Sequence, residues 1–429
     1  MIARSFGSGP SMRRCVLSIV AALVLAIGIA SPAWADVRPS TDLVLGSTEA
    51  SRGLSIDNSP DIDAEAALAV TYDGRELFAR NADSEYKIAS ITKIMTAIVA
   101  LDNASLTDTI TVSDKAGTTI GSSAQLRPGD TMSLKTALQG LLVPSGNDAA
   151  VAIAETVGAR LVTDAQPDPE GAFVDAMNAR AAEIGCTDTL FTNPHGLDSD
   201  GYESDAHSTA HDVAKMTAYA MQNDTFRSIV GGGDVTVTVT QKDGTQRAIT
   251  LISTDELLGV YDGMVGVKTG TGDVALNCFA GACERTEDSI YTVVLGSSTE
   301  EGRFDATASL LDWAFDNIQD VDLINSPYAL DRSGANVPVV AEVACTDKTV
   351  RATVADPDAL TRIFAASGTI TQDVSYDEPS GAVKSGDKVG AIDFFQGSER
   401  IASVDLIAAE DVAAPNIFEG FGIWFARLV

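Results

Sequence analysis

Strand-like patterns lie on both sides of a long helical region, and this arrangement constrains the fold more than any other feature of the chain. Residues 67–72 alternate between apolar and polar side chains, Asp73-Gly74 supplies a turn, and a second strand follows, which predicts a β-hairpin. Strand patterns return only in the runs DVTVTVTQ, GMVGVKTG, VALNCFAGACE and SIYTVVLGS. The sheet must therefore be assembled from distant segments, which predicts an α+β sandwich.

Helical patterns fill the region between these strands. They cover residues 90–101, 133–143, 147–158 and 171–184, and one more follows the last strand in FDATASLLDWAFDNI. A further helix is expected to begin near Thr209, a threonine N-cap with Asp212 three residues later. After about residue 322 short β-like segments broken by Gly, Pro and Asp predict a separate, small, all-β domain that extends to about residue 412.

The N-terminus has the pattern of a secretory signal peptide. Arg13 and Arg14 precede an apolar run, and SPAWA offers a small-residue cleavage site before Asp36. The alternative is an uncleaved anchor, although the run is short for a membrane span. Residues 36–62 are polar and turn-rich, and we interpret them as a linker or loose lead-in. Export is the expected location.

Length and charge exclude some classes of protein. A chain of 429 residues with 45% hydrophobic residues can form more than one core, which excludes a disordered or fibrous protein. The formal net charge is −31, and removal of residues 1–35 makes it more negative because they contain arginines and no acid. A nucleic-acid partner is not expected, since phosphate binding requires a basic surface. We interpret the acidity as an aid to solubility.

The cysteines do not form a dense disulfide framework. Cys186, Cys278, Cys283 and Cys345 follow the predicted signal peptide and are scattered. Cys278 and Cys283 lie in one predicted strand at an odd separation, which places them on opposite faces and predicts buried thiols.

The tail PNIFEGFGIWFARLV repeats apolar residues at helical spacing, with Ile417, Phe421, Trp424 and Leu428 on one side. It is too short to span a bilayer. The alternatives are an interfacial amphipathic helix and a segment packed on its own protein, and the scarcity of basic residues and the two glycines weaken the first.

A serine and a lysine interrupt the apolar run IASITKIMTAIVA. On a helix Ser90 and Lys93 are three positions apart, so both project from one face. A buried lysine loses its proton readily, and a neutral amine beside a hydroxyl is a general base beside a nucleophile. The alternative is that Lys93 extends to the surface and Ser90 is incidental, which the tetrad alone favours.

Two further motifs reverse that balance. Ser145-Gly146-Asn147 ends an apolar helix, and Lys268-Thr269-Gly270 ends a strand. S-x-x-K, a Ser-x-Asn element and K-T-G occur in this order in penicillin-binding proteins and class A β-lactamases. The stretches SSAQLRPGD, FTNPHGLDSDGY and HSTAHDVAKM extend the match. Over residues 63–318 the chain resembles the low-molecular-weight penicillin-binding proteins, the serine D-alanyl-D-alanine carboxypeptidases.

The resemblance implies a fold and a set of roles. The fold is an antiparallel sheet between helical layers, with a β-rich C-terminal domain and often an amphipathic tail on the outer face of the cytoplasmic membrane. Ser90 would attack the carbonyl of the penultimate D-Ala, and Lys93 would accept its proton. Ser145 would relay a proton to the leaving amine, and Asn147 would hold substrate or Lys93.

The K-T-G strand would bind the substrate. Lys268 would attract the terminal carboxylate, Thr269 would donate a further hydrogen bond, and Gly270 would let substrate lie against the strand. The backbone N–H groups of Ser90 and Thr271 would form the oxyanion hole. The chain departs from the family where Thr271 and Gly272 replace a common His or Tyr followed by Thr, and where Ile88 replaces a common proline.

Other candidates are weaker. His207 and His211 have the i, i+4 spacing of a zinc helix, but H-E-x-x-H is absent and Thr209 is the expected cap, so no metal or other cofactor is expected. Arg303 could reach a substrate carboxylate, but an ion pair at a helix terminus is the more frequent use of such an arginine.

The sequence therefore predicts an exported serine carboxypeptidase that removes terminal D-Ala from peptidoglycan stem peptides and is inhibited by β-lactams. Its alternatives are a β-lactamase and a non-catalytic wall-binding protein. We expect it at the outer face of the cytoplasmic membrane or in the cell wall. The predicted segments are a signal peptide (1–35), a lead-in (36–62), a DD-peptidase domain (63–320), a β-rich domain (321–412) and an amphipathic tail (413–429).

Overall fold

The computed structural model describes residues 43–44, 47–48, 59–324, 329–331, 340–345, 348–379 and 381–426. All of them belong to one unit, residues 40–429. The predicted signal peptide and most of the predicted lead-in lie outside the described residues, so both stay predictions.

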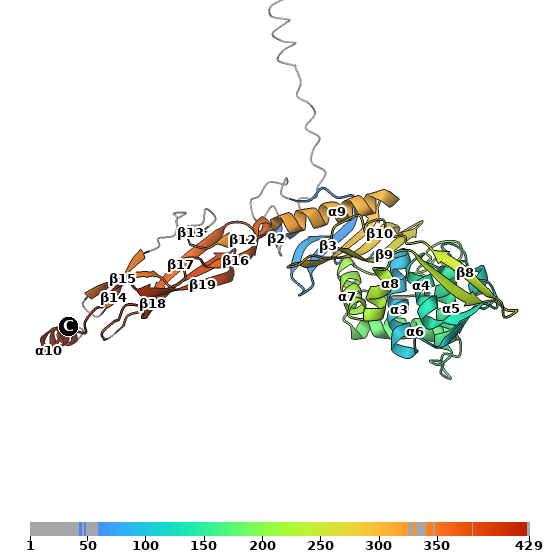
Figure 1. Cartoon of the computed structure of the whole chain (residues 1–429), viewed down its shortest axis with the longest axis horizontal. Coiled ribbons are helices and arrows are strands. Elements are labelled where there is room, and N and C mark those ends of the chain that lie inside the picture. The colour runs from blue at the N-terminus through green and yellow to red at the C-terminus, as the bar shows by residue number, and fades with distance from the viewer. Residues whose placement is uncertain are drawn as a thin grey trace, which may run out of the picture. The chain divides into compact units, whose positions relative to one another are not determined.

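A seven-stranded antiparallel sheet organises the first part of this unit (Figure 1). Its order is β2-β1-β4-β3-β11-β10-β9, with β1 (Leu43–Val44), β2 (Ser47–Thr48), β3 (Ala66–Thr71), β4 (Glu76–Arg80), β9 (Met264–Gly272), β10 (Leu276–Glu284) and β11 (Ser289–Ser297). The predicted hairpin is β3–β4, and β3 pairs with β11 from Ala66↔Leu295 to Thr71↔Ile290. The expectation that distant segments share one sheet is thus confirmed. Strand β9 lies at one edge.

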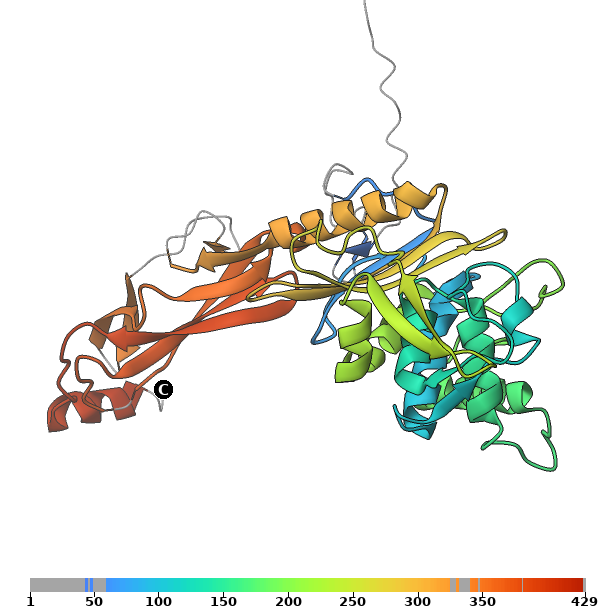
Figure 2. The same cartoon turned by 45° about the vertical axis from the view of Figure 1, so that its right-hand side comes forward.

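Helices cover both faces of this sheet (Figures 1 and 2). One face packs on α9 (Glu300–Asn317), and the core between them contains Phe78, Phe279 and Leu310. The other face carries a larger helical layer whose core contains Ile94, Leu138 and Val213. This layer comprises η2 (Ala89–Thr92), α3 (Lys93–Asn103), η3 (Ala116–Thr118), α4 (Leu134–Leu142), α5 (Asn147–Gly158), α6 (Pro169–Glu183), α7 (Ala210–Met221) and α8 (Asp224–Val230). The α+β sandwich predicted from the sequence is correct.

Helix starts follow local side-chain chemistry. Thr209 caps α7 by accepting a hydrogen bond from the backbone N–H of Asp212, as predicted. The short helix α8 was not predicted, although the side chain of Asn223 caps it by accepting hydrogen bonds from the backbone N–H groups of Thr225 and Phe226. A four-stranded sheet in the helical layer was only partly predicted, because three of its strands have weak patterns. It comprises β5 (Thr109–Thr111), β6 (Thr131–Ser133), β7 (Val235–Thr240) and β8 (Gln246–Leu251).

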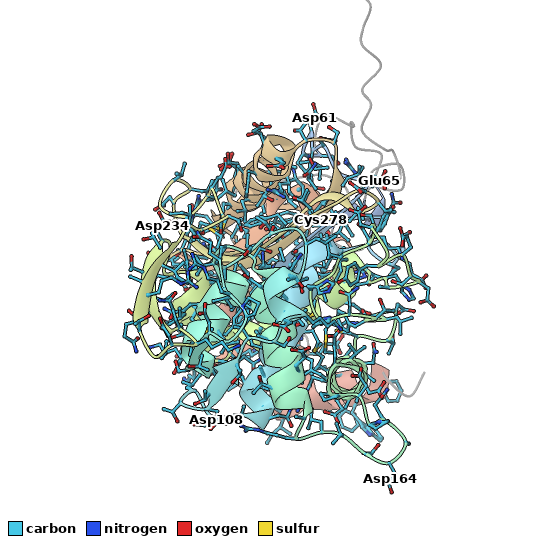
Figure 3. All side chains as sticks on the ribbon, turned by 90° about the vertical axis from the view of Figure 1, so that its right-hand side faces the viewer. Asp61, Glu65, Asp108, Asp164, Asp234 and Cys278 are labelled. Carbon is cyan, nitrogen blue, oxygen red and sulfur yellow. The ribbon has the colours of Figure 1, made fainter. Side chains whose placement is uncertain are left out.

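Cys278 and Cys283 lie on opposite faces of β10, as their spacing predicted. Cys278 packs in the core under the helical layer, and Cys283 packs in the core under α9. Both thiols and that of Cys186 are buried and free. In Figure 3 Cys278 lies among the packed elements, whereas Asp108, Asp164 and Asp234 lie at the periphery. The side chain of Cys345 lies outside the described residues.

The second part of the unit is rich in strands. Its strands are β12 (Ile318–Asp322), β13 (Ala329–Asp331), β14 (Val340–Cys345), β15 (Lys348–Val354), β16 (Leu360–Phe364), β17 (Ile370–Tyr376), β18 (Lys388–Gln396) and β19 (Glu399–Ala408). Strands β12 and β16 pair, and six others form a sheet in the order β13-β17-β18-β19-β15-β14. Val343, Ile392 and Phe394 belong to a core of its own. Apart from the single turn η4 (Ala365–Ser367), the described residues from 318 to 412 contain no helix, which agrees with the predicted all-β texture.

The chain then forms α10 (Ile417–Ala426), within the predicted amphipathic tail. Five of its large apolar side chains are more than half exposed, whereas Ile423 is partly buried; the five are Ile417, Phe418, Phe421, Trp424 and Phe425. Leu428 lies outside the described residues. Among the helices that the structure describes, none is long and apolar enough to cross a bilayer.

Candidate active site

Ser90 and Lys93 meet where a 3₁₀ turn becomes a helix. Ser90 lies in η2 and Lys93 is the first residue of α3, so the turn and the helix together give the spacing that the sequence predicted for one helix. The Nζ atom of Lys93 lies 2.7 Å from Ser90 Oγ. The same amine donates to the backbone carbonyl of His195, also at 2.7 Å. Ser90 is partly accessible, whereas Lys93 is completely buried.

The surroundings of Lys93 favour its neutral form. Burial lowers the pKa of Lys93 well below its usual value, and the positive charge of Lys268 lowers it further, while Asp148 acts in the opposite direction. Burial also lowers the pKa of His195 to about 3. A neutral amine within hydrogen-bond distance of a hydroxyl has the geometry of a general base and its nucleophile.

Ser145 and Asn147 form a second group at the junction of α4 and α5. Ser145 has a backbone φ of +61°, an uncommon conformation for a residue with a side chain, and its buried Oγ has no hydrogen-bond partner among the described residues. Asn147 donates its amide to the carbonyl of Ile120 at 2.7 Å, and its Oδ1 has no partner among those residues. Both atoms are buried and keep hydrogen-bonding capacity that no described residue uses.

The third group lies on the edge strand β9. Lys268 is buried and donates to the backbone carbonyl of Thr269 at 2.9 Å. The Oγ1 of Thr269 lies 2.6 Å from that of Thr254, and Thr271 is exposed. Among the strands that the structure describes, β9 pairs only with β10, so its other edge can pair with an extended peptide.

Gly270 allows β9 to lie close to the turn that carries Ser90. A Cβ atom at Gly270 would lie 2.7 Å from the carbonyl oxygen of Ile88 and 3.3 Å from the backbone nitrogen of Ser90. The expected reason for this glycine was space for substrate along the strand. The structure gives a different one, because β9 could not approach the Ser90 turn so closely with a side chain at this position.

Arg303 is used differently from the expectation. The preferred prediction was an ion pair at the start of α9. Burial lowers the pKa of Arg303 and the charge of Glu300 raises it from a distance, but Arg303 forms no ion pair among the described residues. Instead its Nη1 donates to the carbonyl of Gly270 at 3.1 Å and to Thr271 Oγ1 at 2.7 Å. The ion-pair prediction was wrong, because α9 packs across the sheet and directs this buried side chain to β9.

His207 and His211 have separate surroundings. His207 lies before α7, where its Nδ1 is 2.6 Å from the carbonyl of Asp205. His211 lies between Asp83 and Glu76, with one ring nitrogen 2.7 Å from each carboxylate. The described residues contain no cluster of three or more His, Cys, Asp or Glu side chains placed to hold a metal ion.

Three residues of the site were not assigned from the sequence. His195 positions Lys93 through its carbonyl, Asp148 holds the loop beside Asn147, and Asp255 is buried near Lys268. His195 lies in the stretch FTNPHGLDSDGY and Asp148 follows Ser145-Gly146-Asn147, so both had a positional signal. Asp255 had none.

A serine whose base is a lysine one turn away, beside the edge strand of an antiparallel sheet, is the arrangement of the penicillin-binding type of serine hydrolase. The chain belongs to the D-alanyl-D-alanine carboxypeptidase family, whose model matches residues 54–299.

The matches to known relatives extend over most of the length of each relative. The D-alanyl-D-alanine carboxypeptidase DacF of Bacillus subtilis is 28% identical over 82% of this chain and 86% of its own. DacB2 of Mycobacterium tuberculosis is 33% identical over 60% of this chain and 84% of its own.

The solved structure of the Streptomyces K15 DD-transpeptidase is 31% identical, with a TM-score of 0.56, over 60% of this chain and 99% of that one. The D-alanyl-D-alanine carboxypeptidase DacD from Francisella tularensis shares the fold over 82% of this chain and 94% of that one, with a TM-score of 0.56 and 23% identity.

Proposed function

We propose that this chain is a serine D-alanyl-D-alanine carboxypeptidase that removes the terminal D-Ala from peptidoglycan stem peptides through an acyl-enzyme on Ser90. The observation that carries the proposal is the 2.7 Å contact between Ser90 Oγ and the buried amine of Lys93. Membership of the family supplies the reaction class.

In the first step Ser90 Oγ attacks the carbonyl carbon of the penultimate D-Ala. Lys93 takes the hydroxyl proton, and the backbone N–H groups of Ser90 and Thr271 stabilise the oxyanion, a contribution of about 3–4 kcal/mol for one donor. The C–N bond then breaks as Lys93 returns this proton, relayed by Ser145, to the amine of the departing D-Ala, which leaves Lys93 neutral again. In the second step water attacks the ester and gives a proton to Lys93, and that proton passes to Ser90 Oγ as the shortened peptide leaves.

The free carboxylate of the substrate selects the end of the peptide. Lys268 and Arg303 concentrate positive charge beside β9, and Thr269 adds a hydroxyl. Asn147 Oδ1 can accept from a substrate amide, and the free edge of β9 can pair with the peptide backbone. β-Lactams carry a carboxylate and a reactive amide that correspond to the terminal carboxylate and the scissile amide of the peptide, so they would acylate Ser90.

The location of the reaction is the outer face of the cytoplasmic membrane or the cell wall. The proposal rests on the signal-peptide pattern of residues 1–35 and on the exposed apolar side chains of α10, which match an interfacial helix. Deletion of residues 413–429 should release the protein from the membrane fraction. An unchanged partition would refute the anchor.

Two other functions share this fold. A β-lactamase would hydrolyse penicillin rapidly, and a wall-binding protein would bind stem peptides without turnover. The unpaired Ser145 hydroxyl and the contact between Ser90 and Lys93 favour a working site over a decayed one.

The test is to incubate the protein with a fluorescent penicillin and with diacetyl-Lys-D-Ala-D-Ala, beside Ser90→Ala. We expect covalent labelling and D-Ala release, both lost in the variant. Rapid release of opened penicillin without D-Ala would identify a β-lactamase. Peptide binding with neither labelling nor release would identify a binding protein.

A further inference from the structure

Asp255 is a buried carboxylate for which the mechanism above gives no role. It lies in the loop between β8 and β9 and is 9% exposed. Its Oδ1 accepts a hydrogen bond from the backbone N–H of Leu257 at 2.9 Å, and its Oδ2 has no partner among the described residues. Burial of an unpaired carboxylate oxygen lowers the stability of a protein, so we expect nearby charges that stabilise Asp255.

The loop that carries Asp255 is fixed to the active site. The residue before it, Thr254, donates its backbone N–H to the carbonyl of Val143 at 3.2 Å. The Oγ1 of Thr254 lies 2.6 Å from that of Thr269, the residue after Lys268. Asp255 is thus held beside the K-T-G strand by contacts on its own neighbour.

Two buried cations share this region. Lys268 donates to the carbonyl and hydroxyl of Thr269, and Arg303 donates to the carbonyl of Gly270 and the hydroxyl of Thr271. All four acceptors are neutral. Burial lowers the pKa of Lys268 to about 7, and the charge of Arg303 lowers it as well. An uncompensated pair of buried cations would favour the neutral form of the lysine.

Asp255 supplies the compensating charge. Its interaction with Lys268 raises the pKa of that lysine. In return Lys268, from β9, and Arg303, from α9, oppose the burial that raises the pKa of Asp255 to about 6. Glu300 of α9 is the acid that acts most on Arg303, and Glu256, beside Asp255 on its loop, acts on Arg303 as well. Lys93, from α3, interacts with Lys268, whose positive charge lowers the pKa of Lys93.

We infer that Asp255 is the buried counter-ion that keeps Lys268 protonated, so that Lys268 can bind the terminal carboxylate of the substrate. Asp255 does not touch the substrate, so it is a positioning residue that acts through Lys268. This inference rests on the proposed function, because it assumes that Lys268 binds the carboxylate of a D-Ala-D-Ala peptide.

The inference predicts a defect that grows with pH. Asp255→Asn keeps an oxygen for the N–H of Leu257 and removes the charge, so the pKa of Lys268 falls. Below about pH 6 Lys268 is protonated with or without Asp255, so the variant should resemble the wild type there. Above pH 7 a larger fraction of Lys268 is neutral in the variant than in the wild type. The kcat/KM of the variant for the peptide should then be lower than that of the wild type by about tenfold for each unit by which the pKa of Lys268 is lowered.

The experiment measures kcat/KM and KM for diacetyl-Lys-D-Ala-D-Ala between pH 5 and 9 in the full chain. We expect Asp255→Asn to move the alkaline limb to lower pH and to raise KM there. Asp212→Asn is the control, because Asp212 is also a buried carboxylate, lies in α7 and accepts hydrogen bonds from the backbone N–H of Asp188 and the amine of Lys215. A loss that is the same at every pH, or a limb that does not move, would overturn the inference.

Two measurements separate this inference from the proposed function. In a Lys268→Arg background the guanidinium stays charged, so Asp255→Asn should no longer move the limb. An NMR titration of the ¹⁵N-labelled lysine amines, with Lys268 assigned through the same variant, reports the pKa without any turnover. A lowered pKa in Asp255→Asn supports the counter-ion even if no D-Ala is released, and an unchanged pKa overturns it even if the carboxypeptidase is active.

Discussion

The amine of Lys93 lies 2.7 Å from the hydroxyl of Ser90 and equally close to the backbone carbonyl of His195. The carbonyl accepts a hydrogen bond from one N–H of the amine, so the lone pair of a neutral amine can face Ser90. Thr96, one turn further along α3, donates to the neighbouring carbonyl of Pro194 at 2.6 Å and fixes the same loop. The nucleophile and its base are therefore aligned before substrate arrives.

Replacement of Lys93 by arginine should abolish acylation. A guanidinium does not lose its proton in proteins, so the variant keeps the positive charge and lacks the base. We expect the rate of Ser90 labelling by fluorescent penicillin to fall by about 10²–10⁴-fold, the usual value of a general base. Thermal unfolding is the control for folding. Near-normal labelling in a folded Lys93→Arg protein would show that another group takes the proton.

Gly270→Ala should damage the site through the backbone. The new Cβ would lie 2.7 Å from the carbonyl of Ile88, so β9 or the Ser90 turn must move. We expect a stability loss of about 1–3 kcal/mol by urea unfolding and at least a tenfold slower labelling of Ser90. Gly420→Ala is the control, because among the described residues no atom lies within 4 Å of its Cβ position. Equal labelling rates in the two variants would contradict the close contact between β9 and the turn.

Much of the fold and the centre of the site could be predicted from the sequence. The hairpin β3–β4, the start of α7 and the opposite faces of Cys278 and Cys283 follow from alternation, capping and strand period, which are local rules. Ser90 and Lys93 could be paired because three positions on a helical turn bring side chains together. Each of these predictions depends on residues close in the chain.

The residues that could not be predicted act across the fold. Arg303 reaches β9 because α9 packs over the sheet, and Gly270 is required because a turn 180 residues earlier in the chain lies against it. Asp255 lies in a loop with no motif, and only the packed structure shows that it is buried near two cations. Neither periodicity nor spacing contains such information.

His211 should make the stability of the protein depend on pH. Its hydrogen bond to Glu76, and then that to Asp83, raise the pKa of His211 above the usual 6.5. Its stabilising effect is therefore complete below pH 6.5 and is lost as the pH rises through the raised pKa. We expect His211→Gln to lower Tm at pH 5.5, with a loss of roughly 0.5–1 kcal/mol, and to have less effect at pH 9. The same loss of Tm at both pH values would contradict a charged pair.

Asp148→Asn should loosen the loop beside Asn147. The Asp148 carboxylate accepts four hydrogen bonds, from the Ser123 hydroxyl and from the backbone N–H groups of Ala124, Leu126 and Ala149. An amide replaces one oxygen by a donor, so two of these groups lose their acceptor. We expect a stability loss of about 2–4 kcal/mol in urea unfolding.

Labelling of Ser90 should slow in the same Asp148→Asn protein, because the loop from Ile120 to Leu126 also holds Asn147 through the carbonyls of Ile120 and Ser122. Asp164→Asn, at an exposed loop position, is the control and should change stability by less than about 0.5 kcal/mol. A protein that is destabilised but labels at the normal rate under folding conditions would show that Asp148 serves stability alone. Slow labelling in the folded variant would instead show that the carboxylate sets the position of Asn147, and so the geometry in which the substrate meets Ser90.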